Sequence, residues 1–391
     1  MIAINTDKGG AVPVYQQISR QIEEYIRSKK LPADTALPNI KDIAGLAGVS
    51  LRTADMALRA LIDEGICYRR PKKGTFVAGR MSEGLYRRKI VGVNCPFKPD
   101  SLNAHHVENA IYMGLIQNSG EYGFTPFFIN DDLEANIKFY RDSRETLLEG
   151  VIMLSGSSGQ EELNTLEHYA PTPFILINYD NTGGALESLP ENIHCIFNDD
   201  YLGAYQAAEH LIRAGHRDFA IITFDIDNDN YRNRVAGYLQ AISDNGLQFR
   251  PELLINGGRA AEAPEPDLVK SGEKILRGSR LGWIEYPYLR GQIGLGAELL
   301  NRAQKTGIDF SAALCVNDYL AFGATCSGAD IAVTGYDNIM PELSREGGFP
   351  TVAIDFAEMG KRALKVLAGD IPAASRVTRV MPQLIPRNQQ G

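Results

Sequence analysis

The chain has 391 residues, of which 44% are hydrophobic and 23% are charged, and its net charge at pH 7 is −8. The length predicts about two or three domains, and the composition excludes a disordered or fibrous chain because it suffices to bury ordinary globular cores. The acidic total argues against nucleic-acid binding by the chain as a whole.

The charge is unevenly distributed along the chain. Residues 1–89 contain 16 Lys and Arg against 9 Asp and Glu, a net charge of +7, whereas the remaining residues contain 24 against 39, a net charge of −15. A basic segment on an acidic body is expected when only one domain contacts phosphate groups.

The cysteines lie far apart, without the spacing of a metal site: Cys67, Cys95, Cys195, Cys315 and Cys326. Such an odd, irregular set favours buried thiols in a reducing compartment. Residues 1–15 lack the pattern of a signal peptide, and no apolar run approaches the roughly 18–20 residues of a membrane span. We therefore expect a cytoplasmic protein with no membrane partner, no metal and no cofactor.

Residues 14–28 are predicted to form an amphipathic helix, because apolar side chains recur at helical spacing: Tyr15, Ile18, Ile22 and Ile26. After a proline-containing turn, Asn39 is expected to cap a short helix. A second helix is expected to follow the tight turn at 48–50, with Ser50 as its cap and Gly65 at its end. Two short helices joined in this way are typical of a helix-turn-helix, whose second helix enters the major groove of DNA.

Two β-rich runs follow, at 66–70 and 75–78, and a Pro-Lys-Lys-Gly turn separates them. This pattern predicts a β-hairpin. Four cations lie at or near its tip: Arg69, Arg70, Lys72 and Lys73. They favour a wing that contacts phosphates.

This segment resembles the DNA-binding domain of the GntR family of bacterial transcription regulators. The matching motifs are PVYQQI at 13–18, LP at 37–38, GVS at 48–50 and KKGTFV at 72–77. The resemblance implies a winged helix-turn-helix (α+β) domain over residues 1–79 that binds a double-stranded DNA operator. The residues expected at the DNA are Lys41, Ser50, Arg52, Thr53, Asp55, Arg59, Arg69, Arg70, Lys72, Lys73, Gly74 and Thr75.

The second helix departs from that family at two positions, since Leu51 and Asp55 stand where the family usually has arginine. A carboxylate that faces phosphates is unfavourable, but Asp55 is able to accept a hydrogen bond from cytosine in the major groove. It is also placed to pair with Arg52 and Arg59 on the same helix face, which would leave only a solvated charged surface. Both interpretations stay open, as does a winged helix that docks to protein instead of DNA.

Residues 80–89 are expected to be a linker, after which the pattern changes. Short apolar runs near residues 90, 127, 151 and 174 alternate with helical segments, and the alternation restarts after residue 198 with runs near 219, 253, 313 and 331. It predicts parallel, doubly wound sheets in two similar α/β lobes. Ligands of such folds bind at the carboxyl ends of the strands, here in a cleft between the lobes.

Residues 90–391 resemble the sugar-sensing domain of LacI-family repressors, which is similar to type I periplasmic sugar-binding proteins. HLIRAGHR at 210–217, VNDYLAFG at 316–323 and VTGYDN at 333–338 carry the resemblance. It implies a first lobe of residues 90–197 and 357–375 and a second lobe of residues 199–354 and 378–391. The joined architecture is similar to AraR-type regulators, which combine a GntR-like head with a LacI-like sensor.

The same resemblance implies effector-binding side chains at Asn178, Arg234, Tyr286, Asn317 and Asp337. The guanidinium of Arg234 suits vicinal hydroxyls or a carboxylate, and an ionised Asp337 accepts hydrogen bonds from sugar hydroxyls. Tyr286 is expected to stack on the ligand ring, a role that Trp283 or Tyr288 would also suit.

Simpler roles are open for two of these sites, since Arg234 and Asp337 are suited to a structural ion pair and Asn317 to capping the next helix. We expect no enzyme, because the sequence has no phosphate loop, pyridoxal lysine motif or nucleophile triad. The expected protein is a homodimeric, sequence-specific transcriptional regulator, a repressor of carbohydrate-utilisation genes that a small sugar-like effector releases. The alternatives are a regulator that senses a nucleobase or an acidic sugar, and a ligand-binding protein with a protein-docking head.

Overall fold

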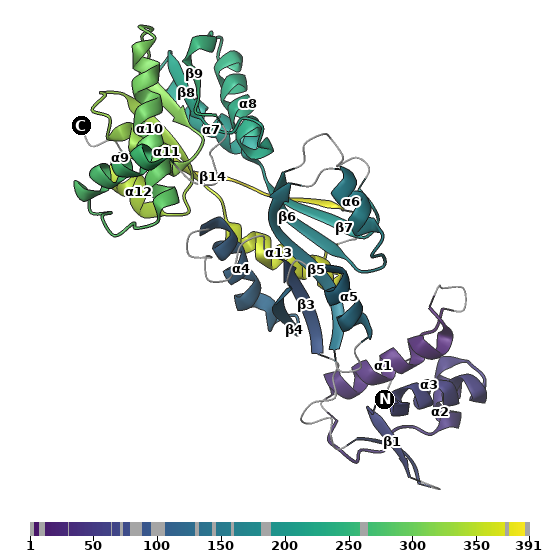
Figure 1. Cartoon of the computed structure of the whole chain (residues 1–391). Coiled ribbons are helices and arrows are strands. Elements are labelled where there is room, and N and C mark those ends of the chain that lie inside the picture. The colour runs from purple at the N-terminus through teal and green to yellow at the C-terminus, as the bar shows by residue number, and fades with distance from the viewer. Residues whose placement is uncertain are drawn as a thin grey trace. The chain divides into compact units, whose positions relative to one another are not determined.

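The computed structural model describes residues 4–7, 12–29, 31–63, 65–70, 73–78, 88–94, 106–129, 133–142, 146–157, 160–180, 189–258, 265–371 and 375–387. The chain divides into two compact units, one of Met1–Lys89 with Ile137–Leu147 and the other of Ile90–Asn136 with Leu148–Gly391 (Figure 1). Among the described helices, none is long and apolar enough to cross a membrane.

In the first unit, three helices precede a two-stranded antiparallel hairpin: α1 (Val14–Ser28), α2 (Ile40–Ala47), α3 (Leu51–Asp63), β1 (Cys67–Arg70) and β2 (Gly74–Val77). The Asn39 side chain accepts hydrogen bonds from the N–H groups of Lys41 and Asp42 at 2.9 and 3.1 Å. The Ser50 hydroxyl accepts from the N–H of Thr53 at 3.1 Å. Both predicted caps thus satisfy N–H groups that a helix start leaves without partners, and the predicted helix-turn-helix with its hairpin is confirmed.

A single apolar core holds these elements together. Its buried members come from all three helices and the hairpin, and they include Ile18, Ile22, Ile43, Leu58, Leu61 and Val77. The turn between α2 and α3 passes through Gly48 at φ +61°, a conformation that glycine adopts without strain. The outer face of α3 remains free of this core, because its inward face supplies the apolar contacts.

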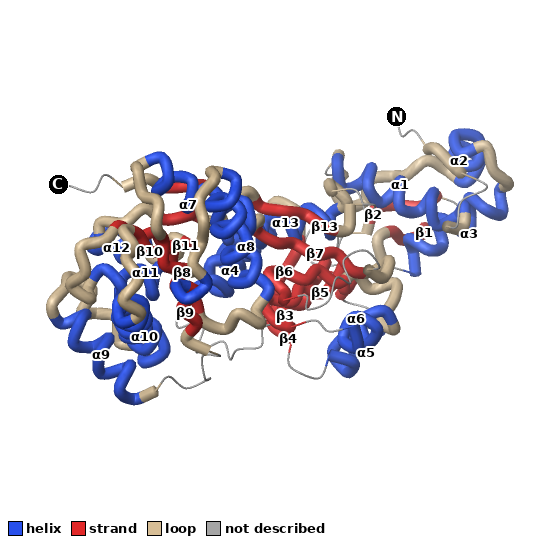
Figure 2. Tube along the Cα trace, turned by 90° about the horizontal axis from the view of Figure 1, so that it is seen from above, coloured by secondary structure: helices blue, strands red, loops and turns tan. Residues whose placement is uncertain are grey.

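The second unit contains two six-stranded sheets. The first has the order β13-β7-β6-β5-β3-β4, in which the strands are β3 (Arg88–Asn94), β4 (Phe124–Ile129), β5 (Thr146–Ser157), β6 (Phe174–Asp180), β7 (Ile193–Asn198) and β13 (Val377–Val380). The helices that accompany it are α4 (His106–Ser119), α6 (Gln160–Glu167) and α13 (Phe356–Ala368), whereas α5 (Leu133–Asp142) is divided between the two units. Figure 2 shows β5, β6 and β7 side by side in this sheet.

The second sheet has the order β14-β12-β11-β10-β8-β9. Its strands are β8 (Phe219–Thr223), β9 (Leu254–Asn256), β10 (Ala312–Cys315), β11 (Ala332–Asp337), β12 (Thr351–Ala353) and β14 (Gln383–Ile385). The accompanying helices are α7 (Asp200–Arg213), α8 (Asp229–Asp244), the 3-10 turn Pro251–Leu253, α9 (Pro266–Arg277), α10 (Pro287–Lys305), α11 (Asp318–Thr325) and α12 (Pro341–Gly347). Neighbouring strands are parallel except for the pair β12–β14.

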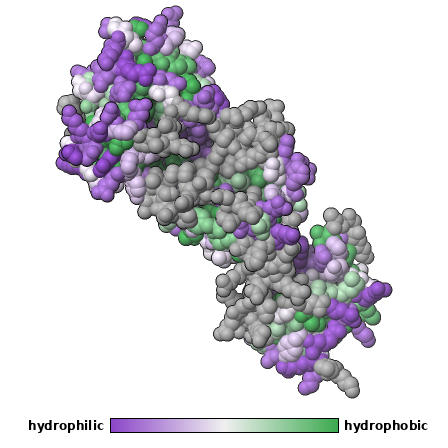
Figure 3. All heavy atoms as spheres, viewed as in Figure 1, coloured by the Kyte–Doolittle hydropathy of each residue, from purple (hydrophilic) through white to green (hydrophobic). Residues whose placement is uncertain are grey.

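In Figure 1, β8 and β9 lie between α8 and α10, as expected for a sheet covered by helices on both faces. Strands covered in this way are apolar along their whole length, and all residues of β8 and β10 are buried. Polar side chains gather on the outer face of this lobe that is visible in Figure 3. The predicted two-lobed α/β architecture is confirmed.

Two boundaries differ from the prediction. Residues from 378 onward are predicted to belong to the second lobe, but β13 belongs to the first sheet, where Val377 pairs with Cys195 and Val380 with Asn198. Its backbone completes the exposed edge of β7, so the chain enters the second sheet only at β14. The predicted linker 80–89 is also too long, since β3 begins at Arg88, and residues 80–87 lie outside the described part of the chain.

Close helix packing in the second lobe depends on glycine. A Cβ atom at Gly323 of α11 would lie 1.9 Å from the carbonyl oxygen of Ile293 in α10, and one at Gly296 would lie 2.2 Å from the carbonyl oxygen of Leu320. Helices approach this closely only where side chains are missing, so α10 and α11 position the residue that precedes α11, Asn317, through their backbones.

We predict that Gly323→Ala lowers the free energy of unfolding by about 1–3 kcal/mol, because backbone must move to admit the methyl group. Gly120→Ala is the matched control, since no atom lies within 4 Å of its added Cβ, and its effect should stay within about 0.5 kcal/mol. Urea unfolding followed by circular dichroism measures both. Equal stability of the two variants would contradict the close packing of α10 and α11.

Candidate DNA interface and candidate ligand site

Most residues predicted at the DNA are exposed on the first unit. The exposed set is Lys41, Ser50, Arg52, Arg59, Arg69, Arg70, Lys73 and Gly74. Thr53 and Asp55 are half-buried, whereas Thr75 is 5% exposed and belongs to the packed side of the hairpin. Lys72 lies outside the described residues. The structure therefore presents α3 and β1 to solvent as a basic surface but withdraws Thr75 from it.

Asp55 has different partners from those predicted. Its carboxylate contacts Arg59, four residues later on α3, at 2.9 Å and Arg69 of β1 at 2.9 Å. Arg52 forms no ion pair with any described residue, although it was predicted to pair with Asp55. The hydrogen bond from Arg69 and the charges of both arginines hold the pKa of Asp55 below its usual value, against the opposing effect of partial burial.

The second arginine of β1 is also held. Arg70 contacts Asp34 at 3.1 Å, and its guanidinium lies 5.2 Å from the ring centre of Tyr68 and 5.0 Å from that of Phe76. The hydroxyl of Tyr68 donates to the same Asp34 carboxylate. Ion pairs and aromatic contacts thus fix both arginines of the hairpin in place.

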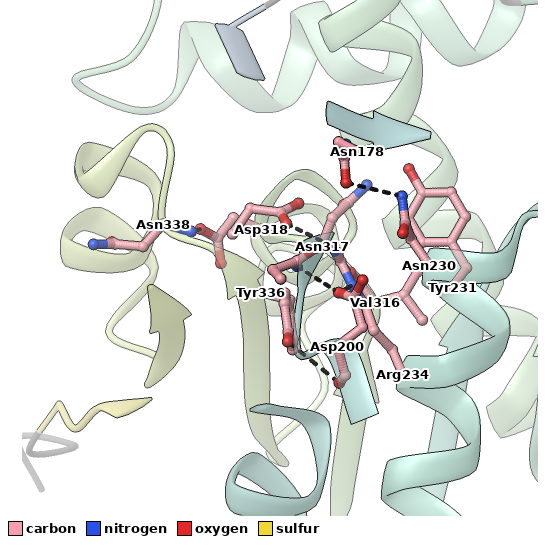
Figure 4. Close-up of polar contacts among 12 residues, drawn as sticks. Asn178, Asp200, Asn230, Tyr231, Arg234, Val316, Asn317, Asp318, Tyr336 and Asn338 are labelled. Carbon is pink, nitrogen blue, oxygen red and sulfur yellow. Dashed lines mark hydrogen bonds and ion pairs between the residues drawn. The ribbon is translucent and has the colours of Figure 1, made fainter. Parts of the chain in front are cut away.

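In the second unit, a buried guanidinium lies where several elements of the second lobe meet (Figure 4). Arg234 of α8 is 4% exposed. Its Nε donates to Oδ1 of Asp200 at 2.6 Å, its Nη2 lies 2.8 Å from Oδ1 of Asp337, and its Nη1 donates to the carbonyl oxygen of Val316 at 2.5 Å. All three nitrogens of the guanidinium are therefore bonded, to acceptors on α7, on β11 and in the chain between β10 and α11.

Aromatic rings surround this arginine. Its Cζ lies 3.9 Å from the ring centre of Tyr336 and 5.5 Å from that of Tyr231. The hydroxyl of Tyr336 donates to the carbonyl oxygen of Asp200 at 3.3 Å. Stacking on π-faces adds cation–π attraction to the ion pairs. Burial alone would lower the pKa of Arg234, but Asp200 and Asp337 hold it well above its usual value.

Two carboxylates, of Asp200 and Asp337, contact this single guanidinium, and that of Asp318 is buried near them. Burial raises the pKa of Asp200 to about 6, although Arg234 and a hydrogen bond from Asn198 oppose the rise. Burial also raises the pKa of Asp318 well above its usual value, although Thr351 donates to its Oδ1 at 2.6 Å and the N–H of Asn338 donates to its Oδ2 at 2.8 Å. The two carboxylates in contact with Arg234 thus outnumber its one positive charge, which disfavours a ligand that brings further negative charge.

The two predicted asparagines have defined contacts. Asn317 is 3% exposed, accepts a hydrogen bond from the N–H of Leu320 as the cap of α11, and donates to Gln292 at 2.8 Å. Asn178, at the end of β6 in the first lobe, has φ +55° and accepts from Asn230 of α8 at 3.3 Å. This bond brings Asn178 to the second lobe, so the structure gathers Asn178, Asn317 and Arg234 around one region (Figure 4). Asp337 joins them through its ion pair with Arg234.

Tyr286 is not among these contacts. It is 39% exposed and occupies the cap position of α10, without a hydrogen bond from its side chain to the helix. Tyr288, one of the two alternatives from the sequence, accords better with the site, because it contacts Gln292 and shares its surroundings with Glu108 and Asp225. Trp283, the other alternative, is 58% exposed.

Sequence reasoning missed several members of the site. Asp200 and Tyr336 contact the predicted Arg234 directly, and Asp318 accepts from the N–H of Asn338. Tyr319 is 8% exposed with no hydrogen-bond partner for its hydroxyl among the described residues. Asp318 and Tyr336 directly adjoin the predicted Asn317 and Asp337 in sequence, a signal that was available. Asp200 lies far from Arg234 in sequence and had no such signal. Across the described residues, no cluster of His, Cys, Asp and Glu is suited to a metal.

Three family models match the chain. The model for bacterial regulatory proteins of the gntR family matches residues 14–77. The model for periplasmic binding proteins and the sugar binding domain of the LacI family matches residues 109–263, and that for a periplasmic binding protein-like domain matches residues 208–388.

Similar proteins are transcriptional regulators rather than enzymes. The HTH-type transcriptional repressor PurR of Pasteurella multocida is 22% identical over 386 residues, covering 90% of this chain and 98% of that protein. The arabinose metabolism transcriptional repressor of Geobacillus stearothermophilus is 23% identical over 401 residues, covering 97% and 98%. A solved transcriptional regulator CelR–cellobiose complex is similar with a TM-score of 0.55 and 18% identity, covering 90% of this chain and 100% of that one. At this identity the structural likeness shows the fold.

The raised pKa of Asp200 predicts a pH dependence of stability. The pKa of Asp200 is about 6 in the folded protein against an ordinary value of 3.8. The contribution of its protonated carboxyl to the free energy of unfolding is therefore complete below about pH 4 and is lost as the pH rises through 6. We predict that between pH 4 and pH 6.5 the free energy of unfolding of the wild type falls, relative to Asp200→Asn, by about 2 kcal/mol. Urea unfolding at several pH values measures the difference, and parallel pH profiles would contradict it.

Proposed function

We propose, from the premise that this chain is a GntR-type winged helix-turn-helix domain fused to a LacI-type periplasmic-binding-protein-like domain, that it is a sequence-specific DNA-binding transcriptional repressor under the control of a small ligand. In this proposal residues 1–79 bind an operator and residues 90–391 bind the effector. The single observation that carries it is that one chain contains both a basic winged helix and, in its second unit, the buried Arg234 cluster.

The surface of the first unit supports DNA as the partner. An exposed helix with Ser50 at its cap and Arg52 on its outer face has the form that enters a major groove. The hairpin beside it carries Arg69, Arg70 and Lys73 exposed, as expected for contacts to phosphates. A protein-docking head would not need this density of cations. Repressors at low identity to this chain support the same assignment.

The charge of the Arg234 cluster supports a neutral ligand. Two carboxylates, of Asp200 and Asp337, contact one guanidinium, so an anionic ligand would add repulsion. Hydroxyl groups, in contrast, donate to carboxylates and accept from amides such as that of Asn317. A neutral polyhydroxylated sugar therefore suits the site better than an acidic sugar. The arabinose repressor and the CelR–cellobiose complex support a sugar.

The mechanism that we propose uses two copies of the chain. A homodimer would place two α3 helices in major-groove half-sites about 34–36 Å apart, or at a multiple of that spacing. Asn178 of the first lobe contacts Asn230 of the second, so a ligand that binds between such residues prefers one arrangement of the lobes. The ligand then shifts the equilibrium by its differential affinity for two states, and release of the operator is the expected direction.

DNA binding predicts a steep salt dependence. Fluorescence anisotropy with fragments from upstream of the gene and its neighbours should find one fragment that binds more tightly than random DNA. For a dimer, log affinity should fall with log salt at a slope of about −4 to −8, because each phosphate contact releases counterions. The neutral sugar that binds the effector site should weaken the affinity for this operator fragment by about 10–100-fold. No preference for any fragment would count against an operator-binding head.

The charge argument predicts which ligands bind. By calorimetry, neutral sugars should bind at least about tenfold more tightly than gluconate or sugar phosphates, since like charges repel in a buried site.

Asp337→Asn should weaken binding of the neutral sugar by about 10–100-fold, because a charge-assisted hydrogen bond is lost. Asp267→Asn, at a side chain that is 91% exposed, is the control and should change nothing. Tighter binding of gluconate or of sugar phosphates would refute the charge argument. Binding of a neutral nucleobase would leave the charge argument intact and would show only that the ligand is not a sugar.

A further inference from the structure

The carboxylate of Asp55 lies on α3, on the face expected to enter the major groove, and two arginines share it. Its Oδ2 contacts Nε of Arg59 at 2.9 Å and its Oδ1 contacts Nη2 of Arg69 at 2.9 Å. Arg59 lies one turn further along the same helix, whereas Arg69 lies on β1 of the hairpin. Asp55 thus connects the recognition helix α3 to the wing.

These contacts oppose a role of Asp55 in reading bases. Each of its two oxygens already accepts from a charged donor, and the carboxylate is held ionised by a lowered pKa. To accept from cytosine, Asp55 would have to weaken a charge-assisted bond, which is about twice as strong as a neutral one. The arrangement of the free head therefore favours the bond to the wing over a bond to a base.

The wing is held on its other side as well. Arg70, the neighbour of Arg69 on β1, contacts Asp34 in the segment between α1 and α2 at 3.1 Å. Consecutive side chains of a strand point to opposite faces, so Asp55 and Asp34 hold the hairpin from two sides. A wing held in this way loses less conformational entropy when it meets phosphates than a mobile one would.

We propose that Asp55 is a positioning residue of the DNA interface, which sets the wing against the recognition helix through Arg69 and limits the positive charge that α3 and β1 present. The proposal rests on the proposed function, in which this head binds DNA. Arg59 and Arg69 carry two positive charges and Asp55 cancels one of them. The attraction of α3 and β1 for DNA then depends more on where the arginines are held than on their number.

Loss of Asp55 should therefore change specific and non-specific binding in opposite ways. Asp55→Asn removes the counter-charge, so affinity for random DNA should rise by about three- to tenfold at low salt, with a salt slope steeper by about 1 per head. Affinity for the operator should fall by about three- to tenfold, because ordering a freed wing costs entropy. The ratio of specific to non-specific affinity should thus fall by about tenfold or more.

The matched control is Asp42→Asn. Asp42 is exposed on the first turn of α2 in the same head, and it forms no ion pair with any described residue. The control changes the net charge by the same amount but releases no arginine, so it should raise affinity for operator and random DNA alike. Asp55→Glu, which retains the charge, should restore most of the discrimination.

A second readout does not depend on DNA. Hydrogen exchange of the paired amides of β1 and β2 in the free, full-length protein should be about two- to fivefold faster in Asp55→Asn, as expected when an exposed ion pair is lost. Asp42→Asn should leave these rates unchanged. This measurement reports the connection between wing and helix directly.

Three results would overturn the proposal. If Asp55→Asn matches Asp42→Asn in both DNA affinities, Asp55 is an ordinary surface charge. If its loss of affinity is confined to operators with one particular base pair, Asp55 is a base reader. If the exchange rates of the hairpin stay unchanged, the contact does not hold the wing. If the wild type itself shows no operator preference, the proposed function fails, while the exchange result still decides whether Asp55 holds the wing.

Discussion

The second unit depends on one buried positive charge. A guanidinium withdrawn from water must be matched by acceptors, because an unpaired buried charge costs several kcal/mol. Arg234 meets this requirement by drawing together the start of α7, the end of β11 and the chain after β10. Removing one partner of such a buried pair costs about 3–5 kcal/mol. The same contacts that stabilise the fold therefore position the groups that a ligand would meet.

The first unit uses the same pairing near its surface, with a different consequence. Asp55 and Asp34 each hold an arginine of β1, where solvent screens the charges and each pair contributes little to stability. What these pairs provide is orientation of cations that would otherwise move freely. In both units a carboxylate orients an arginine before a partner binds. The pair is buried in the second unit and exposed in the first.

Local signals in the sequence were sufficient for the elements and their caps. Asn39 and Ser50 were identified because a helix start needs an acceptor within three residues, and both accept as expected. Contacts between distant residues had no such signal: Arg69 replaces Arg52 as the partner of Asp55, and Asp200 meets Arg234 only in the folded chain. β13 looks like a strand whichever sheet it joins, so its sheet became evident only from its pairing with β7. Resemblance, rather than periodicity, indicated Arg234 and Asp337 as partners in one site.

The central claim is that occupation of the ligand site and occupation of the operator are coupled, and coupling between two sites must be reciprocal. The most direct test is the Kd of the effector measured twice, on the free protein and on the protein saturated with operator DNA. The account predicts weaker effector binding on the DNA complex, by the same factor by which the effector weakens operator binding. Equal effector affinities in the two states would contradict it, because a ligand that does not distinguish the two states cannot shift their balance.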